Sequence, residues 1–318
     1  MPKIVFMGTP ETAVKPLEAL IVHPNFDVLA VVTQKDKKVG RKQILTPPPV
    51  KVLAEEHNIP VLQPSTVKNN ADFQSILEKL APDFLVVVAY GQILPTEILE
   101  IPKVSPINIH FSLLPQYRGA SPIEAAFLAG DQETGITFIE MTEEMDTGPI
   151  LHLQRVPIAK EDNAETMREK LSTLAGQLVP TVLQDVLDEV ATPIHQDESH
   201  ASYCHKISKE DGILNLETMT AKEINNRIRA YTPWPGCSLI LGDKKLKLLE
   251  IDVEIDSDQT KKVSPKEIID TEDGIAIGTK NGLIIPKKVQ LQGKREMDIQ
   301  DFLRGNRSLL NESLTTPK

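Results

Sequence analysis

Short apolar runs alternate with segments of helical spacing through the first half of the chain. Two of these segments, residues 10–21 and 71–80, repeat apolar side chains at the spacing of a helix face. The apolar or β-branched runs around them are Lys3–Met7, Asp27–Thr33, Asp83–Ala89 and Pro106–His110. Strands that alternate with helices in this way are typical of βαβ units around a parallel sheet. We therefore predict an α/β fold with a doubly wound, mostly parallel sheet in the N-terminal part.

A long helix followed by a loss of periodicity marks the end of this part. Residues 164–190 place a row of apolar side chains on one helical face, namely Met167, Leu171, Leu174, Leu178, Val182 and Val186. Pro180 is expected to kink or divide this helix. From Ala191 to Lys209 the composition turns to Thr, Pro, His, Ser and Asp without a period. We predict a first domain over residues 1–190, a linker over 191–209 and a second domain over 210–318.

The second domain has the pattern of a small β-rich fold. Ala221–Ala230 has helical spacing, and the TPWPG that follows it predicts a turn. The strand-like runs after this turn are Ser238–Leu241, Leu246–Ile255, Gly274–Thr279 and Leu283–Leu291. Short strands separated by turns favour a small β-barrel.

Composition limits the class of protein. A chain of 318 residues with 40% hydrophobic and 25% charged residues fits two globular domains and argues against wholesale disorder. Its two cysteines, Cys204 and Cys237, cannot build a disulfide framework. The N-terminus lacks the pattern of a signal or transit peptide, and no apolar run reaches the roughly 20 residues of a membrane helix. We expect a cytoplasmic protein without a membrane partner.

A metal site is not expected from the sequence. His200, Cys204 and His205 lie close together, but no fourth ligand follows at a credible spacing.

Charge is unevenly distributed along the chain. The net charge is −10, yet residues 1–207 contain 17 Lys and Arg against 27 Asp and Glu, whereas residues 208–318 contain 18 of each. Screening limits exposed charges to about 10 Å at 0.1 M salt, so local clusters decide whether a polyanion binds.

One local cluster is the segment Thr33–Lys51. It carries Lys35, Lys37, Lys38, Arg41 and Lys42 against Asp36 alone, and it has neither a helical nor a strand period. We predict a long mobile loop there, which beside an active site would suit a polyanionic substrate. The alternative is a solvated surface loop. Further basic residues recur near turns of the second domain, where they either track a nucleic-acid backbone or discourage strand pairing: Lys244, Lys245, Lys247, Lys287, Lys288, Lys294 and Arg295.

The strongest candidates for chemistry are Asn108, His110 and Asp146. Asn108 and His110 end a strand-like run with the same parity, so both side chains point to one face of the sheet. Asp146 follows 36 residues after His110, just before Thr147-Gly148-Pro149. An amide N–H can stabilise an oxyanion, an imidazole can move protons, and a carboxylate can orient the imidazole, as acyl transfer requires. Taken singly, the histidine could be structural and the aspartate a turn residue.

Two loops are candidates for ligand contact. Gly8 follows the first strand, but the other glycines of a G-x-G-x-x-G motif are missing, which disfavours a nicotinamide cofactor. Ser121-Pro122-Ile123-Glu124 has the pattern of a capping box, so the loop 111–120 should end at a helix N-terminus. That end could bind the polar edge or carboxylate of a ligand.

Seven segments together resemble the methionyl-tRNA formyltransferase family, in the expected order over nearly the whole chain. They are FMGTPETA, the GRK before TPPPVK, VVVAYGQILP, NIHFSLLPQYRGASPI, MDTGPIL, AYTPWPG and LQGKREM. The resemblance implies an N-terminal domain that binds 10-formyltetrahydrofolate and an OB-like barrel that helps hold initiator tRNA. The product that it implies is N-formylmethionyl-tRNA. We expect a monomer that uses no metal.

The resemblance also implies roles for individual residues. Asn108, His110 and Asp146 correspond to the catalytic trio: Asn108 stabilises the oxyanion, His110 moves protons and Asp146 positions His110 or a relay water. The implied folate-binding residues are Tyr90, Gly91, Ser112, Leu113, Leu114 and Pro115. Those implied to contact tRNA are Lys38, Arg41 and Lys42.

Other functions are also compatible with the sequence. Proteins similar to this family formylate amino sugars or purine precursors, or hydrolyse formylfolate; the second domain and the basic segment favour tRNA. A tRNA-binding protein without catalysis is disfavoured by the intact trio. An oxidoreductase is disfavoured by the missing glycines.

Overall fold

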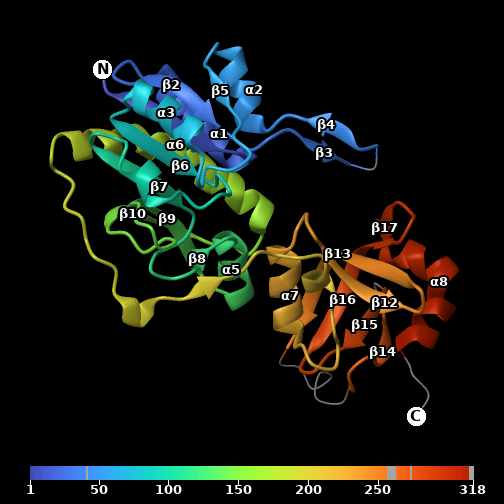
Figure 1. Cartoon of the computed structure of the whole chain (residues 1–318). Helices are drawn as coiled ribbons and strands as arrows, with labels where there is room; N and C mark the ends of the chain where they lie inside the picture. The colour runs from blue at the N-terminus through green and yellow to red at the C-terminus, as the bar shows by residue number, and fades with distance from the viewer. Residues whose placement is uncertain (41, 256–262, 273, 315–318) are drawn as a thin grey trace. The chain divides into compact units, whose positions relative to one another are not determined.

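The chain folds into two compact units (Figure 1). The computed structural model describes residues 1–40, 42–255, 263–272 and 274–314. Unit 1 comprises Met1–Pro122, Glu133–Ile158 and Met167–His205, and unit 2 comprises Ile123–Gln132, Ala159–Thr166 and Lys206–Lys318. Two short segments of the N-terminal half therefore group with the C-terminal unit. The limits of the linker predicted from composition stay a prediction.

Unit 1 is organised around a mixed sheet with the strand order β10-β9-β7-β6-β1-β2-β5. Its strands are β1 (Lys3–Gly8), β2 (Asp27–Val32), β5 (Val61–Leu62), β6 (Phe84–Val88), β7 (Ser105–His110), β9 (Glu133–Glu140) and β10 (Ile150–Pro157). Neighbours from β7 to β5 pair in parallel, whereas β9 pairs antiparallel with β7 and β10 pairs antiparallel with β9. The predicted doubly wound, mostly parallel sheet is confirmed.

Apolar strand residues are buried on both faces of this sheet. Val5 and Met7 of β1 share one face with Leu85 and Val87 of β6, and this face packs against helix α3 through Phe73 and Leu77. Because successive side chains alternate, Ile4 and Phe6, also fully buried, point to the opposite face. Helices of unit 1 include η1 (Glu11–Ala13), α1 (Val14–Val22), α2 (Pro49–Glu56), α3 (Ala71–Leu80), α4 (Thr96–Leu99) and most of α6 (Ala164–Leu187), whose first residues group with unit 2.

Helix α6 packs closely on η1 and α1. The Ser172 hydroxyl donates to the Thr12 carbonyl at 2.9 Å, and a Cβ at Gly176 would come within 2.8 Å of the Lys15 carbonyl oxygen. The helix continues through Pro180, so the alternative in which this proline divides it is wrong.

The basic segment after β2 is a hairpin, and the prediction of an unstructured loop is wrong. β3 (Lys37–Val39) pairs antiparallel with β4 (Ile44–Thr46), and Figure 1 shows the pair projecting from the rest of unit 1. The turn places Gly40 and Gln43 at positive φ. All residues of both strands are exposed, so neither face is buried and no alternating pattern marks the strands in the sequence.

The segment from Ala191 to His205 lies against unit 1. Ile194 bridges to Ile150, η2 spans Glu198–His200, and β11 (Tyr203–Cys204) pairs in parallel with β8 (Arg118–Gly119). The contacts are made by the main chain and by polar side chains. Such contacts produce no periodic pattern of apolar residues, so the composition of this segment predicted a linker.

Unit 2 contains an antiparallel sheet with the order β12-β13-β16-β15-β14, and β17 pairs with β16. Its elements are α5 (Pro122–Ala129), η3 (Glu210–Gly212), α7 (Ala221–Ala230), β12 (Cys237–Leu241), β13 (Lys244–Glu254), β14 (Ile268–Thr271), β15 (Gly274–Gly278), β16 (Leu283–Leu291), β17 (Glu296–Asp298) and α8 (Ile299–Leu314). The predicted second β domain is confirmed as an antiparallel sheet, with α7 and four strands close to their predicted places, whereas closure into an OB-like barrel stays a prediction. Strands β14 and β17 and helix α8 were not predicted.

In the part of the chain that the structure describes, no helix has the length and hydrophobicity to cross a bilayer.

Candidate active site

Three loops meet at the edge of the unit 1 sheet that is formed by the carboxyl ends of its parallel strands. The strand order reverses between β1 and β6, and ligands of open α/β sheets bind beyond the carboxyl ends of strands at such a reversal. The loops that leave β1, β6 and β7 here begin at Thr9, Ala89 and Phe111. The predicted catalytic and folate-binding residues lie at this edge or on the loops beside it.

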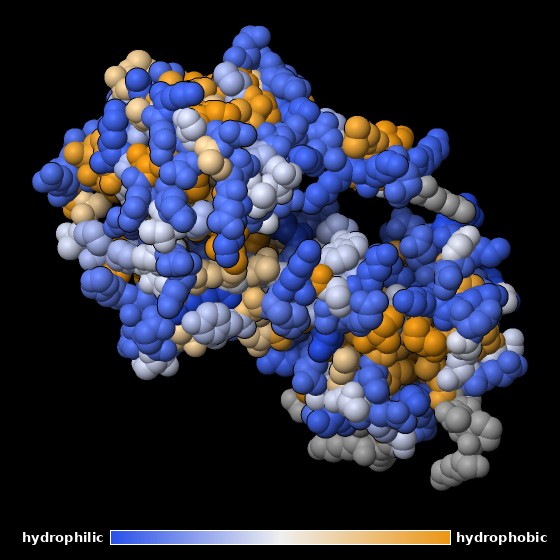
Figure 2. Space-filling view, viewed as in Figure 1, coloured by the Kyte–Doolittle hydropathy of each residue, from blue (hydrophilic) through white to orange (hydrophobic). Residues whose placement is uncertain are grey.

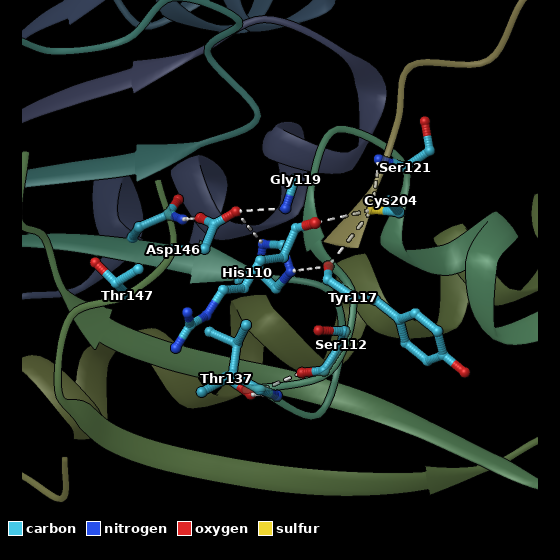
Figure 3. Close-up of polar contacts among 12 residues, drawn as sticks. His110, Ser112, Tyr117, Gly119, Ser121, Thr137, Asp146, Thr147 and Cys204 are labelled. Carbon is cyan, nitrogen blue, oxygen red and sulfur yellow. Dashed lines mark hydrogen bonds and ion pairs between the residues drawn. The ribbon is translucent and has the colours of Figure 1, made fainter. Parts of the chain in front are cut away.

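The predicted trio comes together in space, and Figure 3 shows Asp146 beside His110. The side-chain amide of Asn108 donates to Asp146 Oδ1 at 3.1 Å, and Asp146 Oδ2 lies 3.6 Å from His110 Nδ1. The Gly119 N–H donates to the same Oδ2 at 2.8 Å. The Asp146 carboxylate therefore contacts both other members of the trio and the loop after β7.

His110 is held from both sides of its ring. Its Nε2 lies 3.0 Å from the Tyr117 carbonyl oxygen, and because a carbonyl only accepts, Nε2 carries the hydrogen of this bond. The other nitrogen, Nδ1, faces Asp146. The two side chains are only 6% and 9% exposed, so water screens their interaction weakly. A fixed imidazole beside a carboxylate is suited to moving protons.

The Asn108 side chain is held by its strand and by Asp146. Its register neighbours are Val87 on β6 and Ile139 on β9, which fixes the strand on both sides. One of its two amide hydrogens reaches Asp146. The second can be donated to an oxygen that gains negative charge.

Asp146 sits in a strained turn that returns onto β9. Its φ of 57° lies in the left-handed region, which costs a non-glycine residue roughly 1–2 kcal/mol. The turn is closed by Glu140 N–H, which donates to the Pro149 carbonyl at 3.1 Å. A Cβ at Gly148 would overlap the Glu140 carbonyl oxygen, so the turn requires glycine there. Sequence reasoning missed this role of Gly148.

The loop after β6 offers its main chain to the site. Thr9 Oγ1 donates to the Tyr90 carbonyl at 2.9 Å, and Gln34 Nε2 donates to the carbonyls of Tyr90 and Gly91 at 3.2 and 3.1 Å. The Tyr90 ring is 1% exposed and belongs to the core, and its burial raises the pKa of the phenol to about 12. Neither Thr9 nor Gln34 was singled out as a ligand-loop support from the sequence, since nothing local marks them.

The Ser112–Pro115 loop is held by hydrogen bonds to Gln116 and to Thr137 of β9. The Ser112 hydroxyl donates to the Gln116 carbonyl at 2.7 Å, while the Thr137 hydroxyl donates to the Ser112 carbonyl at 2.7 Å and accepts from Leu114 N–H at 3.2 Å. Ser112 and Leu114 are buried, whereas Leu113 and Pro115 are half-buried. The last two are therefore the partly exposed side chains of this loop.

Lys38 and Lys42 are exposed on the hairpin β3–β4, and Arg41 lies outside the described residues. The apolar side chains of Val39, Ile44 and Leu45 are 55%, 60% and 62% exposed beside them, and Figure 2 shows this hydrophobic patch next to hydrophilic side chains. At the hairpin base Lys51 Nζ lies 3.0 Å from Asp36. The hairpin thus has a surface with both cationic and apolar side chains, and an ion pair holds its base.

Comparisons with known proteins show the family to which the chain belongs. Residues 2–183 match the family model described as formyl transferase, and residues 206–307 match the one described as formyl transferase, C-terminal domain. A methionyl-tRNA formyltransferase of Nitratiruptor sp. is 47% identical over 96% of this chain and 97% of the relative. One of Caldicellulosiruptor saccharolyticus is 44% identical over 95% and 96%.

A solved structure shares the fold. An N-formyltransferase of Helicobacter canadensis, in complex with folinic acid and dTDP-3-aminofucose, has a TM-score of 0.66 at 20% identity and covers 90% of this chain and 99% of its own.

Proposed function

Because this chain belongs to the formyl transferase family, and within it to the methionyl-tRNA formyltransferases, we propose that it formylates methionyl-initiator tRNA. The formyl donor is 10-formyltetrahydrofolate, and the product is N-formylmethionyl-tRNA for translation initiation. The observation that carries this proposal is the contact of Asn108, His110 and Asp146 at the edge of the sheet.

The loops at this edge fit a reduced folate. A pterin is flat, with a polar edge that pairs with main-chain groups and faces that pack on apolar side chains. The main chain of Tyr90 and Gly91 is held in place by Thr9 and Gln34, and Leu113 and Pro115 are half-buried apolar side chains on the neighbouring loop. We assign the folate to these two loops.

The trio then divides the chemistry of transfer. The methionyl amine attacks the formyl carbon, a new C–N bond forms, and the bond from that carbon to N10 of the folate breaks. The second amide hydrogen of Asn108 stabilises the oxygen as it becomes negative. His110 assists the proton transfer from the attacking amine toward N10, and Asp146 holds the side chains of Asn108 and His110 in position.

The hairpin β3–β4 is assigned to the tRNA, with Lys38 and Lys42 as phosphate contacts. We expect the double variant Lys38→Ala/Lys42→Ala to raise KM for methionyl-tRNA by roughly tenfold with kcat unchanged, and to reduce the slope of log affinity against log salt by about 2, one for each lost contact. Steady-state kinetics at several salt concentrations measure both quantities.

Lys15→Ala is the matched control, since Lys15 is an exposed lysine of unit 1 paired with Glu18 on helix α1. A KM and a salt slope equal to those of the control would contradict the assignment of the hairpin.

The proposed reaction is tested by incubating the protein with 10-formyltetrahydrofolate and methionylated initiator or elongator tRNA. Formylation of the initiator alone supports the proposal. Formylation of an amino-sugar nucleotide in its place supports the alternative acceptor, and tRNA binding without transfer supports a binding protein. We also propose that the protein acts as a cytoplasmic monomer, which sedimentation of the purified chain and cell fractionation test.

A further inference from the structure

Arg118 is a buried cation next to the catalytic trio. Its side chain is fully buried, while the Glu198 carboxylate that it binds is 69% exposed. Its Nη1 and Nη2 donate to the two oxygens of Glu198 at 2.9 and 2.7 Å, and Nη1 also donates to the Tyr203 hydroxyl at 3.1 Å. This bidentate pair raises the pKa of Arg118 and lowers that of Glu198. A guanidinium held this firmly fixes the main chain that carries it.

That main chain contacts both His110 and Asp146. The carbonyl of Tyr117, before Arg118, accepts from His110 Nε2, and the N–H of Gly119, after Arg118, donates to Asp146 Oδ2 (Figure 3). Ser202 also binds the main chain of Tyr117 and Arg118. Its hydroxyl accepts from Tyr117 N–H at 2.9 Å, and its carbonyl accepts from Arg118 N–H at 2.8 Å.

Gln196 links Arg118 to the turn of Asp146. Its Oε1 accepts from Arg118 Nε and Nη2 at 3.1 and 2.8 Å, which orients the amide. Its Nε2 then donates to the carbonyls of Asp146 and Gly148 at 2.8 and 2.7 Å. The amide thereby uses both of its hydrogens on the turn that presents the catalytic carboxylate.

Both contacted segments need such support, because they contain strained backbone. Asp146 has a φ of 57° and Tyr117 a φ of 60°. A non-glycine residue keeps this conformation only where its surroundings fix it. Gln196 and Ser202 supply these contacts from the segment that was predicted to be a linker, and Arg118 joins it from β8.

We propose that residues 196–204 form a strap that positions Asp146 and His110 for formyl transfer, with Gln196 and Arg118 as positioning residues. The proposal rests on the formyl transfer proposed above and adds that the chain after helix α6 sets the geometry of the trio. Neither Gln196 nor Arg118 needs to touch a substrate for this role.

The test compares Gln196→Ala with wild type and with Gln184→Ala, a glutamine on helix α6 whose amide contacts Asp188. We expect Gln196→Ala to lower kcat by roughly tenfold or more, because small displacements of catalytic groups are costly, while KM for both substrates stays within about twofold. Gln184→Ala should keep wild-type values. Glu198→Ala, an exposed change that releases Arg118, should lower kcat less, and it serves as the second variant should Gln196→Ala fail to fold.

A mutant cycle with Asp146→Asn separates positioning from a general loss of structure. If Gln196 acts through Asp146, adding Gln196→Ala to Asp146→Asn should change the single-turnover rate by less than about twofold, since residues that act as a unit are not additive. The same loss in both backgrounds would overturn the proposal, as would wild-type kcat in Gln196→Ala and Glu198→Ala. A wild type that formylates no tRNA would overturn the proposed function instead, whereas an active wild type with unaffected strap variants would remove the strap alone.

Discussion

Alanine at Asn108 is expected to lower kcat for formyl transfer by roughly 10²-fold or more, with smaller changes in the KM values. The reason is that the side-chain amide donates to an oxygen whose charge develops only as the amine attacks. Loss of a donor of this kind raises the barrier without weakening substrate binding to the same degree. Single-turnover transfer from 10-formyltetrahydrofolate to methionyl-initiator tRNA measures the effect directly.

Asn25→Ala is the control for this substitution, because Asn25 is exposed and lies before β2, away from the trio. It should retain wild-type transfer. The contact of Asn108 with Asp146 is also lost in the alanine variant, so the melting temperature is recorded with the rate. A folded Asn108→Ala protein with near-normal turnover would remove Asn108 from the chemistry.

Gly148→Ala should be nearly as damaging, although Gly148 takes no part in the chemistry. Its Cβ would overlap the Glu140 carbonyl oxygen, and because this neighbour is main chain of β9, the turn has to move instead. Asp146 lies two residues away and would shift from Asn108 and His110. Misplacement of a catalytic group by about 1 Å can cost about 10²-fold, so we expect kcat to fall by roughly that factor.

Gly305→Ala provides the matched glycine control, since Gly305 lies in helix α8 and a Cβ there meets nothing within 4 Å. It should leave kcat unchanged. Both variants are compared by kcat and by thermal unfolding. A fully active Gly148→Ala protein would contradict the prediction, because the turn would then accommodate the added methyl group without displacing Asp146.

Periodicity predicted those parts of the fold in which side chains are buried in a regular pattern. Helix α3 has the predicted bounds, and β1, β2, β6 and β7 lie within a residue of theirs at each end. Asn108 and His110 share a face because of strand parity alone. Helix α8 was missed although Ile299, Phe302, Leu310 and Leu314 recur at helical spacing and are buried, so its signal was present in the sequence.

Segments that are held without burial of apolar side chains could not be predicted in the same way. The strands of the hairpin β3–β4 bury no side chain, and the strap of residues 196–204 is held by Arg118, Gln196 and Ser202 through polar bonds. Such bonds join residues about 80 positions apart, and no local pattern records them. The distance between Asp146 and His110 was likewise beyond local reasoning, and only the family resemblance indicated it.

Formyl transfer to methionyl-initiator tRNA is tested most directly with a radioactive donor. The wild-type protein is incubated with 10-[¹⁴C]formyltetrahydrofolate, methionyl-initiator tRNA and an amino-sugar nucleotide, and the label is measured in each acceptor. We expect label to enter the tRNA fraction and to be released by mild base as N-formylmethionine, and we expect Asn108→Ala to label that fraction roughly 10²-fold more slowly. Label recovered in the sugar nucleotide or as free formate, with none on the tRNA, would contradict this proposed function.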